Sequence, residues 1–291
     1  MDTPTLISLL NVTALVAIML SMGMEVRFEA VLASARRTRL LVLGLLANYV
    51  LVPAVTLGLL LVFRVNSLVS VGFLILAVCP GAPLGPPFTG VARGDVPWSI
   101  GMMVILAGLS AMLSPALLGV LLARVAPDGD LHIDYLVIVR TLLMTQMLPL
   151  ALGLGIHHGA PALTQWIARP VNRLANVLLL ALVGLIVVTQ YETLGAIRFR
   201  GWTGMGMLLL ASLGIGWLCG GRDFATRKAM AVTTATRNAA VGLVIATSNF
   251  AGKPAVTAVV AYGLVSTLGT LGCALLLGRF AGLESKHVRV R

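Results

Sequence analysis

The chain has 291 residues, of which 58% are hydrophobic and 11% are charged, and its mean hydropathy is +1.00. A soluble domain carries about a quarter charged residues, so this composition excludes a chain that folds in water. The net charge of +11 would suit nucleic acid, but the Lys and Arg residues gather in short connections and tails, so no nucleic-acid partner is expected.

Apolar stretches follow one another along the whole chain. About 20 mostly apolar residues are needed to cross roughly 30 Å of hydrocarbon, so the sequence predicts an all-α polytopic membrane protein with the lipid bilayer as its solvent. We expect a single transmembrane domain over 1–291, with a first half at about 1–125, a second half at about 131–282 and a short basic cytoplasmic tail at 283–291. The first stretch is interpreted as a retained helix, because it lacks a basic leader and a convincing cleavage site. The nine predicted spans are 4–22, 40–62, 67–92, 97–123, 133–157, 169–190, 201–219, 225–250 and 254–279.

The basic residues predict the orientation of these spans. With the N-terminus outside, 14 of the 21 Lys and Arg residues fall on the cytoplasmic side, five fall outside and two lie within spans. Cytoplasmic loops carry the excess of positive charge. The prediction is therefore an N-terminus outside and a C-terminus in the cytoplasm, and the Ala, Leu, Gly and Arg content favours a bacterial inner membrane.

The third span contains an unusual cluster of helix-breaking residues near its middle. Proline lacks an N–H donor and clashes with the preceding turn, at a cost of about 3 kcal/mol in a helix interior. Open backbone at membrane depth is tolerated only inside protein or along a water-filled cavity. The span is therefore predicted to be discontinuous. The cluster and the cysteine before it comprise Cys79, Pro80, Gly81, Pro83, Gly85, Pro86 and Pro87.

The eighth span has a polar centre instead, made of Thr233, Thr234, Thr236, Arg237 and Asn238. The threonines are open to two interpretations, a binding role or ordinary hydroxyl bonding to their own helix. A charge near the membrane centre costs at least about 2.5–3.5 kcal/mol and almost always faces a cavity or a partner. We therefore interpret Arg237 as functional, with a snorkelling structural arginine as the alternative.

The two interruptions lie five spans apart, as expected of two inverted halves whose first half lacks its leading helix. Paired interrupted helices in corresponding positions indicate the substrate site of a transporter. Half-helix N-termini at such a site are expected to present free N–H groups and positive dipole ends, which suit an anion.

Three segments together resemble the bile acid:sodium symporter family. Residues 20–53 are similar to its first conserved block. Cys79-Pro80-Gly81, with Thr89 and the later Arg93-Gly94-Asp95, is similar to its first crossover, and residues 227–246 are similar to its second. The resemblance implies a panel domain and a core domain, two discontinuous crossing helices beside the substrate and sodium sites, and alternating access. Family substrates include bile acids, sulfated steroids and small carboxylates or sulfonates.

The departures from that family pattern concern sodium. The family's sodium-binding Glu corresponds to Thr233 and its Gln to Arg237, while Asn238 is kept; the usual Ser-Asn pair of the first crossover falls on Gly85 and Pro86. A hard cation favours oxygen ligands, and several are missing. We expect Arg237 to replace the bound sodium electrostatically. The alternative is sodium held by backbone carbonyls and the hydroxyls of Thr233 and Thr236.

The resulting prediction is a secondary transporter of an organic anion, with no enzymatic activity, no metal site and no cofactor unless sodium binds. The candidate substrate or ion site comprises Thr89, Thr233, Thr234, Thr236, Arg237 and Asn238, next to the crossover backbone at Cys79, Pro80, Gly81, Gly85 and Pro86. Two other functions stay open, an arsenite-type permease with Cys79 as a thiol ligand and a membrane ligand sensor without transport. The sequence does not predict the substrate, the direction of transport or the oligomeric state.

Overall fold

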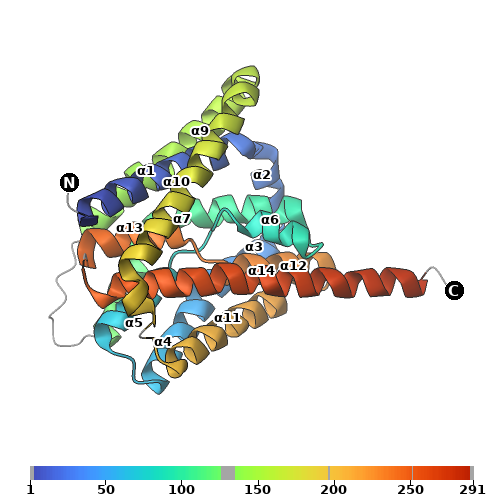
Figure 1. The fold of residues 1–291 in the computed structure, drawn as a ribbon. Coiled ribbons are helices and arrows are strands. Elements are labelled where there is room, and N and C mark those ends of the chain that lie inside the picture. Colours follow the sequence, from blue (N-terminus) through green and yellow to red (C-terminus); the bar gives the residue numbers. More distant parts are fainter. Residues whose placement is uncertain (1–2, 126–134, 196, 251, 289–291) are drawn as a thin grey trace.

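The computed structural model describes residues 3–125, 135–195, 197–250 and 252–288, and every regular element in these ranges is a helix. Figure 1 shows the helices packed in several directions around the crossing segments, with the end of the last helix projecting from the body. The elements are α1 (Thr3–Glu25), α2 (Phe28–Arg36), α3 (Thr38–Leu46), η1 (Ala47–Leu51), α4 (Val52–Val62), α5 (Ser67–Ala77), α6 (Gly85–Val91), α7 (Val96–Val125), α8 (Tyr135–Leu142), η2 (Leu143–Met147), α9 (Leu148–Gly159), α10 (Pro161–Gly195), α11 (Phe199–Cys219), α12 (Phe224–Ala235), α13 (Ala239–Phe250) and α14 (Pro254–Val288).

The described helices confirm an all-helical polytopic membrane protein. Six of them are long and apolar enough to cross a bilayer, and a seventh span is reached if α1 and α2, bent by 80° at residues 26–27, count as one. The two parts of the third predicted span, α5 and α6, have 11 and 7 residues. Each is too short to cross a bilayer alone, so they could form a span only together. The number nine and the inverted relation of the halves therefore stay predictions.

One predicted loop is a helix. The segment after the first span, at residues 23–39, was expected to be a connection, but α2 occupies most of it and packs against α7. The two helices lie very close together: a Cβ added at Gly101 of α7 would be 2.2 Å from Ser34 Oγ of α2, so only glycine leaves room for this contact. The buried residue of α2 is Ser34, whereas Phe28 and Leu32 are exposed, so the contact depends on small residues and is not visible in the apolar pattern of the sequence.

Two helices extend beyond their predicted ends. The sixth span was predicted from residue 169, whereas α10 begins at Pro161, where a proline fits the first turn without losing a hydrogen bond, and it continues through Pro170. The last helix, α14, runs to Val288, so most of the segment predicted as a separate tail continues the helix.

Two short π-helical turns interrupt otherwise straight spans. The turn η1 comes just before Pro53 and η2 just before Pro149. A proline removes one donor from the ladder, and a widened turn accommodates the carbonyl that loses its partner. Each turn carries one buried amide side chain, Asn48 in η1 and Gln146 in η2.

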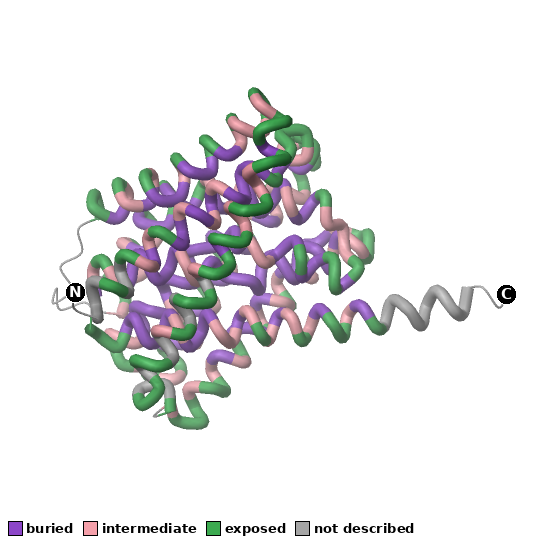
Figure 2. Tube along the Cα trace, turned by 45° about the horizontal axis from the view of Figure 1, so that its top comes forward, coloured by how far each residue is buried: buried purple, intermediate pink, exposed green. Residues whose placement is uncertain are grey.

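The second broken helix lies at the centre of the molecule. In the most apolar stretch of the span formed by α12 and α13, 89% of the residues are buried, whereas 33–44% are buried in the corresponding stretches of the other five spans. The buried segments lie in the middle of the molecule and the exposed ones at its periphery (Figure 2). Around this centre α11 packs on α12, α5 on α14, and α6 on α7 and α12. At one side α1 packs along α9 and α10.

Candidate functional site

The two broken helices meet at their interruptions. The first break separates the end of α5 at Ala77 from the start of α6 at Gly85, and the second separates α12 from α13 at residues 236–238. The backbone N–H of Asn238 donates to the carbonyl of Cys79 over 2.9 Å, and its Nδ2 lies 3.4 Å from the carbonyl of Gly81. Two segments about 160 residues apart in the chain therefore hold each other by backbone contacts, which confirms the two predicted breaks.

Glycine and proline fix the shape of the first break. Gly81 has a φ of +79°, and an added Cβ would lie 2.5 Å from the backbone nitrogen of Ala107 in α7. Only glycine fits both the left-handed backbone and this close approach. Pro86 and Pro87 follow in the first turn of α6, where their missing N–H groups cost little. Gly85 and Pro86 are buried, and neither has a side-chain oxygen to offer an ion.

The guanidinium of Arg237 lies between the C-terminal ends of two half-helices. Its side chain is 2% exposed. Nη1 donates to the carbonyl of Ala77, the last residue of α5, over 3.2 Å, and Nη2 donates to the carbonyl of Thr234 in the last turn of α12. These carbonyls belong to the orphan acceptors that a helix end leaves unpaired.

The charge of Arg237 is balanced by dipoles. In the described part of the chain the one ion pair is Arg37 with Asp95, near the start of α7, so no carboxylate neutralises Arg237. Each helix C-terminus carries roughly half a negative charge, so two such ends match one guanidinium. The two carbonyls therefore face a positively charged side chain. The Nε of Arg237 is buried without a partner.

Hydroxyl groups form a second polar cluster beside the crossover. The hydroxyl oxygen of Ser99 in α7 lies 3.1 Å from that of Thr89 and 3.0 Å from that of Thr233. All three side chains are buried. The cluster joins α6, α7 and α12. A second polar link joins Asn48 Nδ2 to the hydroxyl of Thr234 over 3.3 Å.

Thr236 and Asn238 also make hydrogen bonds within their own helices. The hydroxyl of Thr236 donates to the carbonyl of Val232 over 2.7 Å, four residues earlier on its own helix, which is the ordinary interpretation offered for these threonines. Asn238 accepts from the backbone N–H of Val241 over 3.2 Å and so caps α13. Cys79 is fully buried within the apolar core. Among the residues that the structure describes, no three His, Cys, Asp or Glu side chains come together as metal ligands.

The expectation of free N–H groups at the half-helix N-termini is wrong for α6. Pro86 and Pro87 have no N–H, and those of Gly85 and Phe88 bond to backbone carbonyls. At α13 the N–H groups of Ala239 and Val241 are also used. The dipole ends are present, but the charged donor at the crossover is Arg237.

Two residues of the site were not predicted from the sequence. Ser99 and Asn48 lie in mostly apolar spans that contain neither break. A single hydroxyl or amide in a membrane helix is a weak signal, because such groups often bond their own helix. Asn48 bonds its own helix as well as Thr234, since its Nδ2 also donates to the carbonyl of Gly44 four residues earlier.

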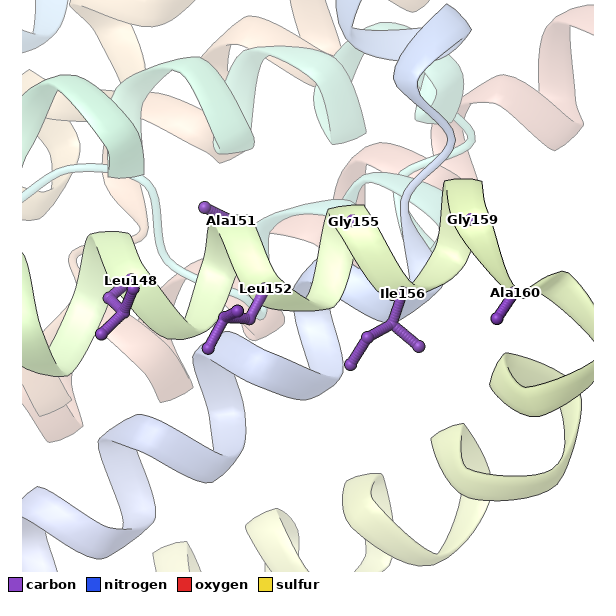
Figure 3. A pocket seen from close by; sticks show the side chains of 7 residues that line it. All are labelled: Leu148, Ala151, Leu152, Gly155, Ile156, Gly159 and Ala160. Atoms are coloured by element: carbon purple, nitrogen blue, oxygen red, sulfur yellow. The ribbon is translucent and has the colours of Figure 1, made fainter.

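A shallow groove elsewhere does not involve these residues. It runs along α9 and ends at the linker residue Ala160, and Figure 3 shows its lining side chains spaced along one helix. All of its lining residues lie between Leu148 and Ala160, so the crossover is not part of it.

The fold and this site define a class of protein. Two discontinuous helices that meet in the interior of an all-helical membrane domain are the arrangement found in secondary transporters. Comparison with known sequences supports the same class. The sequence model of the Sodium Bile acid symporter family matches residues 12–197, more than half of the chain. The chain belongs to this family, and the matched stretch includes the first crossover but ends before the second.

Several named relatives are similar over most of the chain. The Bacillus subtilis protein described as an uncharacterized sodium-dependent transporter, YocS, is 23% identical over 248 residues, covering 82% of this chain and 74% of its own. The ileal sodium/bile acid cotransporter of Cricetulus griseus is 22% identical over 277 residues, covering 94% and 79%. The probable chloroplastic sodium/metabolite cotransporter BASS2 of Oryza sativa is 23% identical over 237 residues, covering 80% and 55%.

Proposed function

We propose that this protein is a secondary transporter of small or amphipathic organic anions that works without a sodium gradient, with Arg237 in the place of the coupling cation. The observation that carries the proposal is the position of the Arg237 guanidinium between the carbonyls of Ala77 and Thr234. A tethered cation there occupies the acceptors that a mobile cation would need. The printed names of the relatives support the substrate class, since they include bile acid and metabolite cotransporters.

Electrostatics support loss of sodium coupling. Two unit charges 4 Å apart repel by about 4 kcal/mol even at an effective dielectric constant of 20, so a sodium ion beside Arg237 is strongly disfavoured. Thr233, where the family has a carboxylate, offers one hydroxyl, already in contact with Ser99. The observation that favours the competing, sodium-coupled function is the cluster of three hydroxyls at Thr89, Ser99 and Thr233.

The test is uptake of radiolabelled taurocholate and small carboxylates into proteoliposomes, with sodium present or replaced by choline. Wild-type flux is expected to be the same in both media. Arg237→Gln should lower it by at least about tenfold, because two charge-assisted hydrogen bonds of about 1.5–3 kcal/mol each are weakened. Arg140→Gln, which alters an exposed arginine of α8, is the matched control and should leave flux unchanged.

A double variant separates replacement of sodium from a purely structural role of the arginine. Thr233→Glu combined with Arg237→Gln brings back the two residue types that the resemblance assigns to sodium binding. We expect it to regain flux that depends on sodium. Wild-type flux that collapses in choline would refute the proposal, and ligand binding without flux in either medium would favour the sensor function.

A further inference from the structure

A cavity of about 330 Å³ lies at one end of the helices that surround the crossover, and the candidate site does not use it. Four helices form its walls: α4 near its end, α5 near its start, and the first turns of α11 and α14. Figure 1 shows α4, α5 and α11 close together at the lower left, next to the beginning of α14. The volume falls at the lower end of the range for small-molecule pockets, about 300–1,000 Å³.

The walls of this cavity are apolar and its mouth is cationic. Leu60, Phe73 and Leu208 line the interior, and the one charged lining residue is Arg200, in the first turn of α11. The Arg200 side chain is exposed and Nη2 donates to the carbonyl of Phe63 at the end of α4 over 3.4 Å, so it reaches across the mouth. A guanidinium has five N–H donors, which leaves donors for a ligand.

The surroundings add positive charge on the same side. Arg64, Arg198 and Lys253 each adjoin a lining residue in the chain, whereas no acidic residue lines the cavity. The lining runs from Phe63 back to Thr56 on α4, which at 1.5 Å per residue is a depth of about 10 Å. Because the mouth lies where apolar helices begin or end, we expect it near a membrane surface, with the interior extending toward the hydrocarbon.

We propose that this cavity binds a single-chain amphipathic anion drawn from the membrane, such as a fatty carboxylate, with the acid group at Arg200 and the alkyl chain between α4, α5, α11 and α14. Apolar walls favour the chain through burial of apolar surface, and a carboxylate can accept from the planar guanidinium in bidentate fashion. The volume suits one alkyl chain rather than a whole phospholipid. The inference is independent of what the crossover transports.

The probe is a photoreactive palmitate analogue with a diazirine in its chain, added to the protein in phosphatidylcholine nanodiscs. The labelled peptides are identified by mass spectrometry. We expect labelling on the four walls, competition by palmitate, and little competition by hexadecanol, which has the same chain without the charge. Arg200→Ala should reduce labelling about tenfold, the loss expected of one charged contact.

A matched pair of glycine variants tests the cavity itself. Gly204 lines it and Gly206 does not, and a Cβ added at either position on α11 meets no atom within 4 Å. Gly204→Leu should therefore fill the cavity and abolish labelling, while Gly206→Leu should label like wild type. Thermal melting of each variant checks that it is folded.

Equal labelling of Gly204→Leu and wild type would overturn the proposal, and so would equal competition by hexadecanol, which would make the cavity an unselective apolar surface. Because the readout is binding and not flux, failure here leaves the transport proposal standing, and failure of transport leaves this one standing.

Discussion

At the scale of single residues, the polar groups of the crossover are backbone carbonyls, hydroxyls and one cation. Arg237 is stabilised where it is because its partners are the ends of α5 and α12, whose partial charges together oppose its own. Ser99 is the residue that links Thr89 and Thr233. Removing Ser99 would leave the buried Thr233 hydroxyl without its partner, while Thr89 would keep the carbonyl of Gly85. An unsatisfied buried group costs more than an average hydrogen bond contributes.

The hydroxyl cluster gives a residue-scale prediction. Ser99→Ala should lower stability by about 1–3 kcal/mol, because two buried hydroxyls lose a partner, and should slow substrate uptake. Thr236→Val is the comparison, since the Thr236 hydroxyl bonds its own helix, and it should change both quantities much less. Thermal melting of the purified protein and proteoliposome uptake measure the two effects. A larger loss in Thr236→Val than in Ser99→Ala would contradict the assignment.

At the scale of elements, the breaks depend on where the chain can open without losing hydrogen bonds. The second break needs no proline, because Asn238 caps α13 and Arg237 donates to the carbonyl of Thr234 in the last turn of α12. The start of α12 is also capped: Asp223 accepts from the backbone N–H of Thr226 over 2.9 Å. That backbone hydrogen bond, with the one from the Thr226 hydroxyl, lowers the pKa of Asp223.

The first break gives an element-scale prediction. Gly81→Ala should destabilise the protein by at least about 1–2 kcal/mol, because an L-residue is strained at a φ of +79° and its Cβ would overlap the backbone of α7. Gly108→Ala is the control, since it lies inside α7 with open space around it, and its melting temperature should equal that of wild type or exceed it. Equal melting temperatures for both variants would show that the break tolerates a side chain.

At the scale of the whole molecule, the positions of the basic residues predict how the spans are oriented in the membrane. The positive-inside rule predicts a C-terminus in the cytoplasm, and each full span must then alternate in direction. The connections before α5 and before α11 would share one side, and those before α3 and before α12 the other. The cavity proposed to bind an amphipathic anion would then open to the outside.

Single cysteines measure this topology. In a variant with Cys79, Cys219 and Cys273 replaced by alanine, cysteines at positions 64 and 198 should react with a membrane-impermeant maleimide in intact cells. Cysteines at positions 39 and 222 should react only after permeabilisation. The reverse pattern would invert the orientation, and a mixed pattern would show that the number of spans is not nine.

Much of the architecture could be predicted because it follows from local chemistry. Long apolar runs predict spans, four prolines within eight residues predict the first break, and a charge among apolar residues marks the second. Helix boundaries were less predictable: α2 and the early start of α10 depend on packing and on a proline that suits a first turn. The π turns escaped prediction because a widened turn changes one backbone hydrogen bond and leaves the apolar pattern intact.

The sequence by itself determined that this protein is embedded in a bilayer, that two of its helices are broken and that Arg237 needs a partner. Each of these features depends on the residues of single segments of the chain. Only the tertiary structure decided which partner that is. The carbonyl of Ala77 lies 160 residues earlier in the chain and belongs to a backbone that every residue shares, so no pattern of side chains marks it. Ser99, Asn48 and the cavity beside Arg200 were decided in the same way, by helices that meet only when the chain is folded.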